Sequence, residues 1–372
     1  MKNCNSNTSA FFALLRAGLW ENGVRLSEFD DVDFEDVYRL ASEQSVVGLV
    51  AAGLERTADR KIPQSIALTI VGDVLQLEQR NRDMDTFIAK LMTQLKDAGV
   101  HSLLVKGQGI AQCYERPLWR SCGDVDLVLD DEGYEKAYAL LSSIGNSIEE
   151  SRRDIKHTEI NIDGWMVELH GTLRSQLGKV IDNGIDAVQK DTFVNNRVRE
   201  WRNGDVEVLL PAPNNDVIFV FTHILQHFFN EGCGLRQICD WCRLLWTYHN
   251  VLDVELLENR LVSMRLMTEW KAFAALAVDT LGMPPEAMPL YSKEERWKKK
   301  GERVLNYVLR VGNMGHNRDL SYRQRASRLA RGLRTFGRVT GDAIAQANIF
   351  PVDALRVWWL IMTKSMGEAV KG

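Results

Sequence analysis

The chain carries two kinds of hydrophobic periodicity, and they divide it into three regions. Apolar residues recur at three- and four-residue spacing through residues 8–98, which predicts several amphipathic helices. The same spacing returns from Asn214 onward. Short apolar runs and alternating stretches lie between them, as is typical of strands. We therefore predict an α+β protein with an N-terminal helical region (1–98), an α/β core (99–213) and a C-terminal helical domain (214–372).

The middle region predicts a small mixed sheet with two short helices. The strands are predicted at 101–107, 124–130, 157–163, 165–171 and 206–213. Helices are predicted at 109–115 and 132–145, the second with a clear amphipathic pattern. The two alternating stretches on either side of Gly164 indicate a β-hairpin with its turn near Asp163 and Gly164.

Two aspartates lie two residues apart at the start of the strand predicted at 124–130. Successive strand side chains point to opposite faces, so Asp124 and Asp126 share one face while apolar residues fill the other. Two carboxylates roughly 6–7 Å apart repel each other, which favours a divalent cation between them, and Mg²⁺ prefers such oxygen ligands. The alternative is a solvent-exposed sheet edge that carries scattered acidic residues.

A third carboxylate occurs in "WMVELHG", where Glu168 and His170 share one strand face. If this strand lies beside the aspartate strand, Glu168 completes a cluster that can hold one or two metal ions. His170 would then either orient the cluster or contact an acceptor molecule.

The stretch "LLVKGQGIAQCY" reads as a strand, a glycine turn and a short helix. Backbone N–H groups at such a turn can bind phosphate, and Lys106 adds a positive charge there. The turn is not a Walker loop, because no G-x-x-x-x-G-K-[ST] occurs in the chain.

These motifs together, "LLVKGQGIA", "YERPLWRSCGDVDLVL" and "VELH", resemble the uncharacterised nucleotidyltransferase family of bacteria, within the DNA polymerase β superfamily. The resemblance implies a nucleotidyltransferase-type mixed sheet. It also implies the following roles: metal ligands and catalytic carboxylates Asp124, Asp126 and Glu168; turn residues Gly107 and Gln108; and triphosphate-facing cations Lys106 and Arg120. The superfamily usually has Gly-Ser or Gly-Gly at the turn, so Gln108 is a departure from its pattern.

The resemblance further implies an enzyme that uses one or two Mg²⁺ ions to move a nucleoside monophosphate from an NTP, such as ATP, to a hydroxyl acceptor. The acceptor would be a small molecule or a protein, and pyrophosphate would be released. Because of Gln108, the alternative is a non-catalytic nucleotide-binding or scaffolding protein that retains the fold. Arg120 also has an alternative role, as an ion-pair partner of Asp124 or Glu115.

Composition narrows the remaining classes of function. A formal net charge of -4 gives the molecule no field suited to non-specific nucleic-acid binding. The N-terminus lacks a signal-peptide pattern, and no apolar stretch is long enough for a membrane span, so we expect a cytoplasmic protein. Residues 293–338 nevertheless hold fourteen Lys or Arg against four acidic residues. A solvated basic helix is the default interpretation, and binding of an anionic acceptor such as nucleic acid is the alternative.

Two further pairs have the i, i+4 spacing of one helix face. His223 and His227 lack the His-Glu-x-x-His pattern of a metal site, which leaves interior packing or a substrate-facing role. Arg236 and Asp240 are predicted to form a buried ion pair within an apolar helix.

Overall fold

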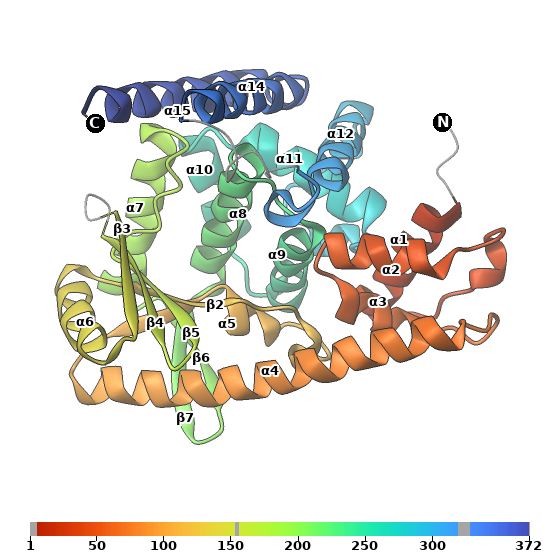
Figure 1. The fold of residues 1–372 in the computed structure, drawn as a ribbon, viewed down its shortest axis with the longest axis horizontal. Coiled ribbons are helices and arrows are strands. Elements are labelled where there is room, and N and C mark those ends of the chain that lie inside the picture. Colours follow the sequence, from red (N-terminus) through yellow and green to blue (C-terminus); the bar gives the residue numbers. More distant parts are fainter. Residues whose placement is uncertain (1–5, 153–155, 319–327, 372) are drawn as a thin grey trace.

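The computed structural model describes residues 6–152, 156–318 and 328–371 (Figure 1). The fold is built on a five-stranded mixed sheet with strand order β1-β2-β5-β4-β3. The strands are β1 (Ser102–Val105), β2 (Asp124–Leu129), β3 (Ser147–Arg152), β4 (His157–Ile162) and β5 (Trp165–His170). Only β2 and β5 run parallel; the other neighbouring strands are antiparallel. The predicted α+β class with a small mixed sheet is confirmed.

The predicted hairpin is present as β4 and β5. Its turn is formed by Asp163 and Gly164, whose φ angles of 53° and 86° suit a two-residue turn of the type that matches strand twist. A separate two-stranded ribbon is formed by β6 (Val198–Asn203) and β7 (Val206–Pro211). The sequence predicted β7 but neither β3 nor β6.

Helices precede and follow the sheet along the chain, as predicted. Those before or within the sheet are α1 (Ser6–Trp20), α2 (Phe34–Glu43), α3 (Val47–Leu54), α4 (Gln64–Asp97), α5 (Gly107–Ala111) and α6 (Asp131–Ile144). Those after it are α7 (Lys179–Val194), α8 (Pro213–Phe229), α9 (Leu235–Tyr248), α10 (Val254–Ser263), α11 (Met267–Ala275), α12 (Glu295–Val311), α14 (Arg328–Ala347) and α15 (Pro351–Lys371). Among the described residues, no helix is long and apolar enough to cross a membrane. Part of the predicted basic segment, 319–327, lies outside the described residues.

The buried side chains form two large apolar clusters. One joins α1–α3 to the helices after the sheet, from α7 onward. The other lies between the sheet, α6 and the second half of α4. The N-terminal and C-terminal helices thus share a core although the sheet separates them in sequence. The predicted boundaries at residues 98 and 213 stay a prediction.

Helix α4 links the two cores. Ile70 in its first half packs in the helical core, and Ile88 in its second half packs under the sheet. Figure 1 shows this long helix running from beneath α1–α3 to the sheet. At its middle, the buried Asn81 carboxamide donates to the carbonyls of Leu118 and Arg120 at 2.6 and 2.9 Å. The helix therefore fixes the segment that leads into β2.

The buried carboxyl group of Glu269 makes stability depend on pH. Glu269 lies on α11 and is 1% exposed; burial, then a hydrogen bond with Asp353, raises its pKa from 4.5 to about 9. The native state therefore keeps a proton that the unfolded chain releases above pH 4.5, so this group destabilises the fold progressively as pH rises toward 9. We expect E269Q to gain on the order of 1–3 kcal/mol over wild type at pH 8 and almost nothing at pH 4.5. Urea denaturation of both proteins across this range measures the difference; a gap that does not change with pH would contradict it.

Candidate active site

The parallel pairing of β2 with β5 brings three carboxylates together. In the ladder, Asp126 lies opposite Glu168, and Asp124 lies one step earlier on the same face as Asp126. One carboxylate oxygen from each of the three residues lies within 4.8 Å of the others. The carboxylates selected from sequence therefore converge.

The opposite face of the same strands anchors the site. Val125 and Leu127 of β2 are fully buried and belong to one apolar cluster with Leu169 of β5 and Ala137 of α6. This is the packing that the alternating pattern predicts. Because a one-residue slip would drive the aspartates into this core, the apolar face fixes which side chains form the site.

Lys106 supplies the nearest positive charge. Its Nζ atom lies 2.6 Å from Oδ1 of Asp126. Burial alone would lower the pKa of the ammonium group, but the charges of Asp126, Glu168 and Asp124 together raise it above its ordinary value. Lys106 has φ 57° and ψ -143°, a conformation that residues other than glycine rarely adopt. The turn places the ammonium group on the carboxylates at the cost of this backbone strain.

Two histidines of the β4–β5 hairpin contact the carboxylate cluster. The Nε2 atom of His170 lies 3.0 Å from Oδ1 of Asp126 and 3.3 Å from Oε2 of Glu168. His157 faces His170 across the hairpin, and its Nε2 atom lies 3.5 Å from the same oxygen of Glu168. Burial opposes ionisation of Glu168, yet these contacts and Lys106 bring the pKa of Glu168 below its ordinary value. Glu168 is therefore an ionised, oriented carboxylate.

Asp124 is the carboxylate whose charge is least compensated. The charge of Asp126, together with burial, raises the pKa of Asp124 to about 6. Asp124 occupies the exposed first position of β2, whereas Asp126 is 3% exposed and contacts both Lys106 and His170. The repulsion between the two aspartates is thus relieved at Asp126 and persists at Asp124.

These residues fit a hard divalent cation. The donor set consists of carboxylate oxygens, which suits Mg²⁺, Ca²⁺ or Mn²⁺ better than softer metals. The raised pKa of Asp124 shows an excess of negative charge that a cation would neutralise. A second group formed by Glu168 with His157 and His170 also meets the spacing of metal ligands.

Arg120 forms a buried ion pair with Asp240. Its Nε and Nη2 atoms donate to the two carboxylate oxygens of Asp240 at 2.9 and 2.8 Å, and both side chains are buried. Tyr114 donates to the same carboxylate at 2.8 Å. Arg120 thus takes the place predicted for Arg236 as the partner of Asp240. The predicted contact of Arg120 with the triphosphate stays a prediction.

The glycine turn also differs in detail from the superfamily's pattern. Gly107 has φ 36°, which explains a glycine there. The Gln108 side chain is buried and its Nε2 atom donates to Oδ1 of Asp85 on α4 at 2.6 Å. Gln108 therefore ties the turn to α4 through its side chain, a role that serine is too short to play.

The histidine pair of α8 lies near the cluster. His223 and His227 approach each other at 3.0 Å between their Nε2 atoms. Burial, followed by the charge of Lys106, lowers the pKa of His223 well below its ordinary value. His223 is thus a neutral imidazole close to Lys106. Sequence reasoning paired these histidines correctly but gave no sign that α8 faces the sheet.

Three residues near the site were missed from sequence. His157 could have been found, because a turn at Asp163 and Gly164 places it opposite His170 in the hairpin. Asp85, the partner of Gln108, and Arg236, near Asp124, lie on helices distant in sequence. No local sequence pattern predicts that these two residues lie near the site.

Comparisons with known proteins place the chain in a family. No curated protein and no solved structure matches it significantly. The profile of the family described as "Uncharacterised nucleotidyltransferase" matches residues 30–282, which include the sheet, the carboxylate cluster and helices from both sides. The match spans well over half of the chain, so the protein belongs to this uncharacterised nucleotidyltransferase family.

Proposed function

We propose that this protein is a Mg²⁺-dependent nucleotidyltransferase that moves a nucleoside monophosphate from an NTP to a hydroxyl acceptor. The observation that carries the proposal is the convergence of Asp124, Asp126 and Glu168 within a nucleotidyltransferase family. In the reaction, the acceptor oxygen bonds to the α-phosphorus and the bond to pyrophosphate breaks. The acceptor loses its proton and pyrophosphate leaves.

Each residue has a task that follows from its surroundings. Asp124 and Asp126 would hold one or two Mg²⁺ ions, which supply charge neutralisation for the phosphates and orient the reacting oxygens. Glu168 is ionised and oriented by His157 and His170, so it can accept a hydrogen bond from the acceptor hydroxyl. His170 acts through the two carboxylates that it contacts and is a positioning residue.

Lys106 has a second task in this proposal. In the absence of metal its ammonium group neutralises Asp126. A cation at the carboxylates would release this lysine to contact phosphate oxygens, since an ammonium group is a compact charge on a flexible stem. The acceptor class, small molecule or protein, stays a prediction, and so does the use of ATP.

Pyrophosphate release tests the proposal. Wild-type protein is incubated with each α-labelled NTP and Mg²⁺, together with candidate acceptors, and both pyrophosphate and labelled product are measured. We expect release by wild type and none by D126N, with circular dichroism showing that the variant is folded. Equal release by both proteins would refute the assignment. NTP binding without pyrophosphate from any acceptor would favour the non-catalytic alternative.

A further inference from the structure

Arg236, in the first turn of α9, forms no ion pair with a carboxylate of the described residues. Its Nη1 atom donates to the carbonyl oxygen of Ser121 at 2.8 Å, and its Nε atom is buried without any hydrogen-bond acceptor. Among the described residues, no carboxylate oxygen lies within 4.0 Å of its guanidinium nitrogens. Arg243, two turns later on the same helix, contrasts with it, because Arg243 is ion-paired with Glu21 at 2.9 Å.

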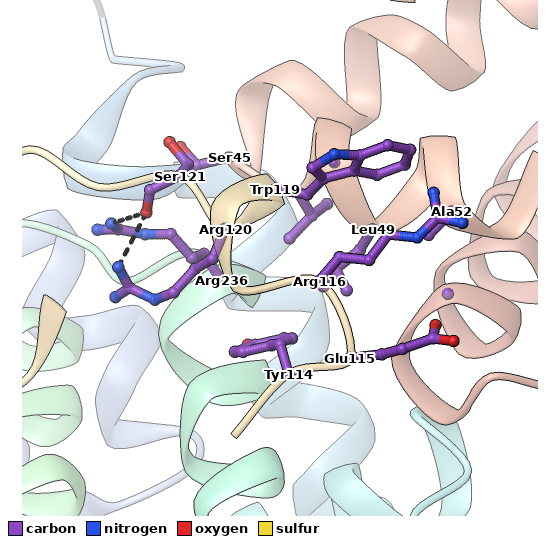
Figure 2. A pocket seen from close by; sticks show the side chains of 13 residues that line it. Ser45, Leu49, Ala52, Tyr114, Glu115, Arg116, Trp119, Arg120, Ser121 and Arg236 are labelled. Atoms are coloured by element: carbon purple, nitrogen blue, oxygen red, sulfur yellow. Dashed lines mark hydrogen bonds between the residues drawn. The ribbon is translucent and has the colours of Figure 1, made fainter. Parts of the chain in front are cut away.

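A second guanidinium group lies beside Arg236. The Nη1 atom of Arg120 donates to the same Ser121 carbonyl at 3.2 Å, and Figure 2 shows both arginines meeting at this oxygen. Asp240 balances the charge of Arg120 through two hydrogen bonds. Burial, then the charge of Arg120, lowers the pKa of Arg236, and the charges of Asp240 and Asp124 offset this only in part. A largely buried cation next to another cation costs stability unless an anion compensates it.

The position of Arg236 relates this unbalanced charge to the carboxylate cluster. Ser121 precedes Asp124 by three residues, and the charge of Arg236 lowers the pKa of Asp124. Arg236 thus lies toward the Asp124 end of the cluster, whereas His170 lies at the opposite end, one step beyond Glu168. The proposed acceptor side and the arginine side are therefore separated by the carboxylates.

A narrow cavity adjoins Arg236 and Ser121 (Figure 2). Its charged lining consists of three arginines and one glutamate: Arg116, Arg120, Arg236 and Glu115. Its volume of about 20 Å³ is room for about one water molecule, which admits a phosphate oxygen but neither a whole phosphate group nor a nucleobase. A guanidinium group offers forked N–H donors that match phosphate oxygens.

We propose that Arg236 binds a terminal phosphate of the NTP and of the pyrophosphate product. The inference rests on the proposed function and assigns the polyphosphate to the Asp124 end of the site. Arg120 is paired with Asp240, whereas Arg236 donates to the Ser121 carbonyl and has no ion pair among the described residues. Because an in-line displacement needs the leaving group opposite the attacking oxygen, the acceptor then approaches from the side of His170.

Binding of inorganic tripolyphosphate with Mg²⁺ to R236M tests the assignment by calorimetry. We expect the dissociation constant to rise about tenfold or more, as for the loss of a charge-assisted contact. R243M is the matched control: the same change on the same helix should leave this affinity at the wild-type value. In denaturation, R243M should unfold earlier than wild type because it breaks the ion pair with Glu21, whereas R236M breaks no ion pair among the described residues and should unfold closer to the wild-type midpoint.

Two results would overturn the assignment. One is wild-type tripolyphosphate affinity in R236M. The other is the absence of any tripolyphosphate binding by wild type with Mg²⁺. These outcomes are separable from failure of the transferase proposal, which pyrophosphate release measures. Release by wild type with unchanged binding in R236M defeats only the role of Arg236. Weakened binding in R236M without release by wild type leaves the anion site standing and defeats the transferase.

Discussion

D124N is expected to lose its transferase activity while the metal-free protein becomes no less stable than wild type. Asp124 donates a carboxylate oxygen to the proposed metal site, and a bound metal ion contributes several kcal/mol to stabilising transition-state charge. At about 1.4 kcal/mol per factor of ten, kcat should fall by about 10³-fold or more. Pyrophosphate release with the NTP that wild type uses measures this loss.

The stability of D124N follows from the repulsion at this position. The pKa of Asp124 is raised to about 6, mainly by Asp126, so the native state disfavours the ionised form that predominates at pH 7. Water screens this exposed residue, and we expect D124N to gain only about 0.5–1 kcal/mol at pH 7. The gain should shrink as pH falls below 6 and vanish only well below the unfolded pKa of 3.8, where Asp124 is protonated in both folded and unfolded states.

Added Mg²⁺ should reverse the order of stabilities. A ligand that binds only the native state raises its stability by mass action, so Mg²⁺ should raise the melting temperature of wild type and not that of D124N. D163N is a suitable control, because Asp163 is an exposed turn residue and asparagine tolerates its positive φ. A D124N protein that keeps kcat within tenfold of wild type, or that still gains stability from Mg²⁺, would contradict the metal-ligand role.

The carboxylate cluster was predictable because it depends on strand alternation. Period-two patterning fixes that Asp124 and Asp126 share a face, and it does the same for Glu168 and His170. Apolar residues between them force these faces away from the core. Strand alternation does not predict that β2 pairs with β5. Without this pairing, the position of Glu168 relative to the two aspartates is undefined. The family resemblance supplied this step.

The partners of the arginines were beyond local reasoning. Arg236 and Asp240 are four residues apart on α9, a spacing that favours a pair. Asp240 instead binds Arg120, which comes from the segment before β2 and offers two parallel hydrogen bonds. The choice between two arginines is decided by how α9 docks on that segment, and docking depends on contacts spread over the whole helical core. The same docking leaves Arg236 without an ion pair in the part of the chain that the structure describes.

R120M is expected to destabilise the fold strongly, because it breaks the buried ion pair between Arg120 and Asp240. R120M leaves the Asp240 carboxylate buried, with the Tyr114 hydroxyl as its one remaining hydrogen-bond donor among the described residues. Breaking a buried ion pair by removing one partner costs about 3–5 kcal/mol, and we expect that loss in urea denaturation at pH 7. R116M is the matched control, because Arg116 lies in the same segment as Arg120 but pairs with the half-exposed Glu55. This variant should lose about 1 kcal/mol or less of folding stability.

A double variant separates the ion pair from the packing of the arginine stem. In R120M/D240L neither charge is buried, so most of the loss should be recovered, and the double-mutant cycle should give a coupling energy of about 2 kcal/mol or more. Losses that simply add would mean that Arg120 stabilises the fold through its aliphatic stem alone. Because the pair joins α9 to the segment that enters β2, its integrity also holds Arg236 beside Asp124. R120M should accordingly also weaken tripolyphosphate binding.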